Sequence, residues 1–166
     1  MLNERFPYFV RRARKEDWED AMAVAWKTFL KFEAEDYTKE GVRSFFDFIT
    51  DSVLYRMFLN GIYHMFVAED KGKIIGIITL RNDTHISLLF VDEAYHRQGV
   101  GSCLMKTLWD FVKTELGKDM VTVNSSPYGR EFYHQLGFWD LGPEVAKDGI
   151  RITHNTERMR TNDVII

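Results

Sequence analysis

Residues 96–102, with the sequence HRQGVGS, are of the types that bind an anion. They stand between an apolar stretch at 85–91 and a segment with helical spacing of its apolar residues. The first turn of a helix has unpaired N–H groups and the positive end of the helix dipole, which together hold phosphate oxygens. Gly99 and Gly101 let the backbone approach such a ligand, and Arg97 can add a charge-assisted contact. The segment therefore predicts a phosphate site at the start of a helix.

Other interpretations of these glycines have to be weighed. A dinucleotide-binding fold would place a third glycine where this chain has Leu104, and its βαβ unit would come near the start of the fold. A P-loop would continue into Gly-Lys-Ser or Gly-Lys-Thr, and no such run follows. The pair also suits a tight connection between a strand and a helix, with no ligand at all. These residues alone do not distinguish a tight connection from a phosphate site, so motifs elsewhere in the chain are needed.

The elements around the loop follow from the spacing of apolar residues. Apolar residues three and four positions apart predict amphipathic helices at 15–32, 38–49, 52–60 and 101–116, with Thr38 as a candidate N-cap of the second. Pro127 suits the opening of a further short helix that ends before Gly137. Apolar runs predict strands at 8–10, 63–68, 73–81, 85–91, 120–123, 138–141 and 150–159. The polar turn at 69–72 predicts an antiparallel hairpin.

Composition limits the class of protein. The chain has 166 residues, of which 45% are hydrophobic and 28% charged, so we expect one folded domain over residues 1–166. A net charge of -3 provides no broad basic surface, and nucleic acid and membrane are not expected partners. Cys103 is the single cysteine, and the five histidines have no metal-ligand spacing, so we expect no disulfide and no metal. With no secretory signal or long apolar run in the sequence, we expect a cytoplasmic protein.

A second motif lies downstream of the loop and makes the resemblance specific. The strand at 120–123 is followed by Asn124, and residues 132–138 read FYHQLGF. A strand, a glycine loop, a helix, a strand that ends in Asn and then F-Y-x-x-x-G-F resemble the GNAT superfamily of acyl-CoA-dependent N-acyltransferases. The resemblance covers almost the whole chain. It implies an α/β (α+β) fold with a mixed, mostly antiparallel sheet of six to seven strands, flanked by helices and split near Asn124 to admit the cofactor.

The resemblance also implies which residues bind acetyl-CoA. The loop pattern of the family falls on residues 96–101, with His96 where the family has Arg or Gln. Backbone groups around Phe90 and Val91 would pair with the pantetheine arm, and Asn124 would contact the cofactor near the splayed strand end. The expected cofactor-binding residues are Phe90, Val91, Arg97, Gln98, Gly99, Val100, Gly101, Ser102, Asn124 and Tyr133.

Two residues are candidates for proton transfer. Tyr133 matches the family tyrosine whose hydroxyl faces the thioester sulfur, and its role would be general acid; the alternative is a core tyrosine beside Phe132 and Phe138. An amine with a pKa of about 10.4 has to lose a proton before it attacks, and His85 has a suitable titration range to act as the base. The alternative interpretation of His85 is an ordinary hydrogen-bonding residue at a strand end.

The remaining polar and aromatic residues have plainer interpretations. Asp83 and Glu93 are weaker candidates for the base than His85, and each is more simply interpreted as a solvated loop carboxylate. The same interpretation holds for Asp92, Glu33, Glu35 and Asp36. Aromatic residues of the first helices are expected in the core, in a homodimer contact or along the acceptor pocket: Trp18, Trp26, Phe29, Phe32, Phe45, Phe46 and Phe48. The expected function is direct transfer of an acetyl group to a primary amine of a small molecule or peptide. The alternative is a catalytically silent acyl-CoA-binding sensor or interaction module.

Overall fold

The computed structural model describes residues 6–142, 145–147 and 150–158. The strands are β1 (Phe9–Arg12), β2 (His64–Asp70), β3 (Lys73–Arg81), β4 (His85–Val91), β5 (Met120–Ser125), β6 (Trp139–Asp140), β7 (Val145–Lys147) and β8 (Ile150–Arg158). The α-helices are α1 (Trp18–Phe32), α2 (Lys39–Ile49), α3 (Ser52–Leu59), α4 (Val100–Thr114) and α5 (Arg130–Gln135). Short 3-10 turns precede and follow α1, at Lys15–Asp17 and Ala34–Asp36, and a third, Glu93–Tyr95, follows β4.

The strands form one mixed, mostly antiparallel sheet, which confirms the predicted fold class. The order is β1-β2-β3-β4-β5-β8-β6, and β7 pairs with β8 outside this path. The pair β4–β5 is parallel, whereas the other pairs are antiparallel. The sequence had placed the last two strands side by side, and β8 does pair with β6. β8 also pairs with β5, so it lies between β5 and β6, and β7 was not predicted.

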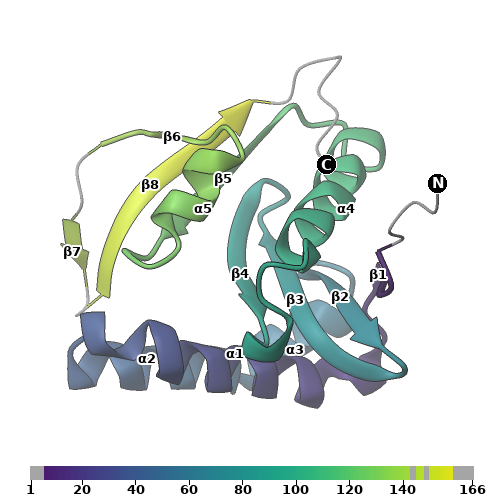
Figure 1. Ribbon diagram of the computed structural model, residues 1–166, viewed down its shortest axis with the longest axis horizontal. Helices are drawn as coiled ribbons and strands as arrows, with labels where there is room; N and C mark the ends of the chain where they lie inside the picture. The colour runs from purple at the N-terminus through teal and green to yellow at the C-terminus, as the bar shows by residue number, and fades with distance from the viewer. Residues whose placement is uncertain (1–5, 143–144, 148–149, 159–166) are drawn as a thin grey trace.

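Helices cover both faces of the sheet (Figure 1). α1, α2 and α3 run along one side, and α4 packs on the other. Consecutive residues of β2 therefore enter different cores, with Met65 and Val67 facing α1 and Phe66 and Ala68 facing α4. A strand covered on both faces has apolar residues throughout, and for this reason β2 and β3 read as unbroken apolar runs.

Local chemistry fixes many of the element ends. The Thr38 side chain accepts a hydrogen bond from the Gly41 N–H at 3.1 Å, as expected of the predicted N-cap. The hairpin between β2 and β3 is tighter than predicted. β2 continues to Asp70, and the turn is reduced to Lys71 and Gly72, both with positive φ. Such two-residue turns match the twist of the strands that they join.

β4 has a β-bulge next to the point where the sheet splits. Thr79 pairs with Leu88 and Leu80 with Ile86, so Ser87 is an extra residue that has no partner in β3. A bulge bends its strand and interrupts the ladder. On the other side of β4, pairing with β5 is limited to His85 and Ile86. Beyond Ile86 the two strands diverge, which is the splay that the sequence placed near Asn124.

Candidate active site

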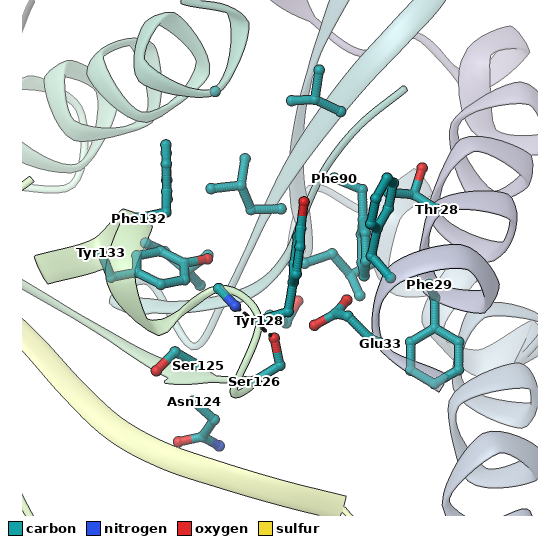
Figure 2. Close-up of a pocket in the computed structure, with 18 of the residues that line it drawn as sticks. Thr28, Phe29, Glu33, Phe90, Asn124, Ser125, Ser126, Tyr128, Phe132 and Tyr133 are labelled. Carbon is teal, nitrogen blue, oxygen red and sulfur yellow. Dashed lines mark hydrogen bonds between the residues drawn. The ribbon is translucent and has the colours of Figure 1, made fainter. Parts of the chain in front are cut away.

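The splay between β4 and β5 opens into a cavity of about 1470 Å³. Its walls come from the end of α1 and the segment after it, from α2, β4, the 96–102 loop, the end of β5 and α5. Figure 2 looks into this cavity, with Phe29 and Glu33 on one side and Phe132 and Tyr133 on the other. Segments that lie about 100 residues apart in the chain thus meet around one space.

The glycine loop has the geometry expected of an anion site. Gly99 is the N-cap of α4 with a φ of 82°, and a side chain at this position would meet no atom within 4 Å. The space over the loop is therefore open, and the N–H groups of the first turn of α4 border it. Gly101 has a different reason to be glycine, because a Cβ there would lie 3.2 Å from the ring of Phe132. These features fit a bound pyrophosphate.

The side chains of the loop have separate positions. Arg97 is exposed and has a φ of 62°. The side-chain carbonyl of Gln98 accepts a hydrogen bond from the Tyr8 hydroxyl. His96 turns back onto β4, where its Nε2 lies 2.6 Å from the carbonyl oxygen of Val91 and therefore carries the hydrogen. His96 thus contacts a backbone group that the resemblance assigned to the pantetheine arm.

Tyr133 lies on α5 with 6% of its surface exposed. Its ring packs against Phe132 and Phe138 at centroid distances of 5.4 and 5.3 Å. Its hydroxyl points into the cavity (Figure 2). Burial, and secondarily the charge of Glu33, raise the pKa of Tyr133 well above its usual value. The phenol is therefore neutral and can donate a hydrogen bond at any ordinary pH.

His85 lines the same cavity at the closed end of the splay. Its Nδ1 lies 2.8 Å from the Oγ1 of Thr122, the residue that it faces on β5. The structure thus brings His85 and Tyr133 to one cavity.

Glu33 is the cavity residue that the sequence interpretation placed incorrectly. It was expected to be a solvated loop carboxylate, whereas it is partly buried and points into the cavity toward Ser126 (Figure 2). Burial raises the pKa of Glu33 to about 7, and the nearby charge of Asp36 adds to this, while a hydrogen bond from Ser126 opposes it. The sequence feature that accompanies this burial is the position of Glu33 directly after Phe32, the last residue of the amphipathic helix α1.

Asp92 was also expected to be solvated, and this was wrong as well. The residue is 6% exposed, its side chain accepts a hydrogen bond from the Ala94 N–H at 3.0 Å, and Lys27 Nζ lies 3.2 Å away. Burial would raise the pKa of Asp92, but these two partners outweigh it and the pKa is lowered. Asp92 therefore stabilises the turn between β4 and the glycine loop as a carboxylate.

Aromatic side chains close one side of the cavity. Phe32 at the end of α1 stacks on Tyr128 from the β5–α5 connection, with ring centroids 5.0 Å apart, and its ring lies 5.1 Å from that of His96. Of the aromatic residues expected in the core or the acceptor pocket, the cavity includes Phe29, Phe32, Phe45 and Phe48. Phe29 and Phe45 also stack on each other, at 4.0 Å, so these side chains serve the core and the cavity together.

Two further properties concern the described part of the chain. Across residues 6–142, whose side chains the structure describes, no three or more His, Cys, Asp or Glu side chains are grouped so that they could hold a metal ion. Every helix of the described residues is too short or too polar to cross a lipid bilayer.

A split mixed sheet, a glycine loop at a helix N-terminus and a tyrosine facing the split define an acyltransferase of the GNAT type. The sequence itself gives the same result, because residues 33–157 match the family model described as an acetyltransferase (GNAT) domain. The chain therefore belongs to the GNAT family and is an acyl-CoA-dependent acetyltransferase. No curated protein matches the chain in a sequence comparison.

Solved structures agree with the fold. A GCN5-related N-acetyltransferase from Rhodopseudomonas palustris superimposes with a TM-score of 0.79 at 22% identity, over 96% of this chain and 99% of that one. PaiA N-acetyltransferase from Thermoplasma acidophilum, solved with coenzyme A, has a TM-score of 0.74 at 19% identity, over 91% and 98%. YncA from Salmonella typhimurium, solved with acetyl-CoA, has a TM-score of 0.69 at 16% identity, over 95% and 96%.

Proposed function

We propose that this protein transfers an acetyl group from acetyl-CoA directly to a primary amine. The observation that carries the proposal is the cavity at the split between β4 and β5, which the glycine loop borders on one side and the Tyr133 hydroxyl enters. The loop can bind an anionic donor, and the split leaves the edge of β4 beyond Ile86 unpaired with β5. PaiA and YncA were solved with coenzyme A and acetyl-CoA respectively, which supports the same donor here.

The donor would contact residues of three elements. The N–H groups of Gly99, Val100, Gly101 and Ser102 would bind the pyrophosphate, and Arg97 and Gln98 lie beside them in the loop. Backbone groups of Phe90 and Val91 on β4 and the side chain of Asn124 on β5 would hold the pantetheine arm. Because His96 contacts the Val91 carbonyl, we expect its ring to move when the arm binds.

Tyr133 would act as the general acid. Expulsion of coenzyme A leaves negative charge on sulfur, and a neutral phenol beside it can donate a proton as that charge develops. The raised pKa of Tyr133 keeps the phenol protonated until that moment. The sequence-based candidate for the base is His85, which lines the cavity and would accept a proton from the amine directly or through water.

The test is coenzyme A release in the presence of acetyl-CoA and a panel of amines, with binding measured separately. The panel contains 2-phenylethylamine, spermidine and an N-terminally blocked lysine peptide. A positioned acid contributes about 10²- to 10⁴-fold, so Tyr133→Phe should lose turnover in this range and keep its affinity for coenzyme A. Tyr133→Phe with parental turnover would remove Tyr133 from the mechanism. Binding of acetyl-CoA without turnover of any amine would instead support a silent sensor.

A further inference from the structure

Glu33 is a carboxylate without a cation to balance it. None of the salt bridges among the described residues includes Glu33. The charged group that affects the pKa of Glu33 is Asp36, which is also acidic, and the hydrogen-bond partner of Glu33 is the neutral side chain of Ser126. Glu33 is partly buried. A carboxylate that has lost part of its water is normally paired with a cation, because its charge is otherwise only partly solvated. The missing partner of Glu33 is therefore expected to come from a ligand.

The surroundings of Glu33 favour an ammonium group as this ligand. The segment after α1 contributes Asp36 and Tyr37, the β5–α5 connection contributes Ser126 and Tyr128, and α5 contributes Tyr133. All of these groups are neutral or acidic near pH 7, and three are aromatic. Aromatic faces and carboxylates both attract an organic cation.

We propose that Glu33 binds the ammonium group of the acceptor and accepts its proton, a role that rests on the proposed function. Glu33 and Tyr133 reach the cavity from opposite walls, and Figure 2 places the carboxylate and the hydroxyl on either side of the space between α1 and α5. His85 lies at the closed end of the split, with its ring on Thr122. Base and acid would thus flank the reacting atoms.

The acceptor ammonium gives one proton to the Glu33 carboxylate, and the free amine nitrogen forms a bond to the thioester carbon. The carbon–sulfur bond then breaks with its electron pair on sulfur, which takes the hydroxyl proton of Tyr133. A second proton leaves the nitrogen and restores that hydroxyl through water, while Glu33 releases its proton to solvent. The products are an amide, the thiol of coenzyme A and one proton.

The experiment compares three variants with the parent chain. Glu33→Gln keeps the shape of the side chain and removes the charge, Glu33→Asp keeps the charge, and Glu35→Gln removes an exposed carboxylate two residues away. For each panel amine that the parent acetylates, kcat/KM is measured from pH 5.5 to 9, and the shift in Tm on adding coenzyme A is recorded in parallel.

We expect Glu33→Gln to lower kcat/KM by about 10²- to 10⁴-fold. It should also lose the rise in rate that the parent shows as pH increases through about 7, where Glu33 ionises. Glu33→Asp should retain this rise at a reduced rate. Glu35→Gln should resemble the parent, and all three should keep the coenzyme A shift.

The experiment distinguishes failure of the Glu33 role from failure of the proposed function. A Glu33→Gln variant with parental kcat/KM and an unchanged pH profile overturns the role of Glu33 and leaves the proposed function intact. A parent chain that binds coenzyme A but acetylates none of the amines overturns both the proposed function and this inference. A structural role alone would lower the Tm of Glu33→Gln at every pH and leave the pH profile of the remaining activity unchanged.

Discussion

Replacement of Glu33 by Gln should stabilise the protein at alkaline pH, although it removes the carboxylate that we propose as the base. In the unfolded chain the carboxyl ionises near its ordinary pKa of 4.5, whereas burial raises the pKa of Glu33 in the folded chain to about 7. Between these two values the folded state binds more protons than the unfolded state. The free energy of unfolding therefore falls as pH rises through this window. Below pH 4.5 the Glu33 carboxyl is protonated in both the folded and the unfolded state, so it no longer lowers the free energy of unfolding.

The size of the effect follows from the same two values. The rise in pKa from 4.5 to about 7 corresponds to at most about 3 to 4 kcal/mol, since one pKa unit is worth about 1.4 kcal/mol. Glu33 is only partly buried and faces a cavity that solvent can enter, so we expect about 1 to 2 kcal/mol above pH 7. For a chain of this length, 1 kcal/mol shifts Tm by about 2 to 4 °C, which gives a gain of roughly 2 to 8 °C.

The assay is thermal unfolding of the parent, Glu33→Gln and Glu35→Gln at intervals between pH 4.5 and 8, at constant ionic strength and without ligand. The difference between Glu33→Gln and the parent should be small at pH 4.5 and grow until about pH 8. Glu35→Gln, which changes an exposed carboxylate, should follow the parent. Parallel curves for the parent and Glu33→Gln over the whole range would refute the reasoning, because the carboxylate would then carry no cost of burial.

Three further variants test other parts of the site. Gly101→Val should displace the first turn of α4, because its Cβ would lie 3.2 Å from the Phe132 ring. The variant should therefore cost about 1 to 3 kcal/mol of stability and abolish the increase in Tm on adding coenzyme A, and an unchanged shift would contradict this placement of the donor. Tyr63→Phe removes a buried hydroxyl that lies 2.6 Å from Ser87 Oγ at the bulge, and should cost about 1 to 2 kcal/mol in denaturant unfolding; a cost near zero would mean that this hydrogen bond does not anchor the bulge. His85→Ala should keep the rise in rate near pH 7, and a flat pH–rate profile would return the role of the base to His85.

In the candidate site, the sequence could predict the motifs that span only a few consecutive residues. The glycine loop was predicted because strand, loop and helix follow one another in the chain, and Tyr133 was predicted from the F-Y-x-x-x-G-F resemblance. Both line the cavity, and their roles stay predictions. Glu33 was missed because its environment depends on Ser126 and Tyr133, about a hundred residues away. A carboxylate in a polar loop has the same sequence signature whether it faces water or another segment.

The sequence by itself determined the elements whose stability is local. Apolar periodicity and end signals predicted β3 and β4 with the ends that the structure has, and Thr38 as the cap of α2, since caps, turns and amphipathic faces depend on neighbours in the chain. Only the tertiary structure decided the bulge at Ser87, the insertion of β8 between β5 and β6, and the burial of Glu33. Each of these features depends on the register between strands or on contacts across the cavity. Such contacts form between segments that are distant in sequence, so neighbouring residues in the chain give no signal of them.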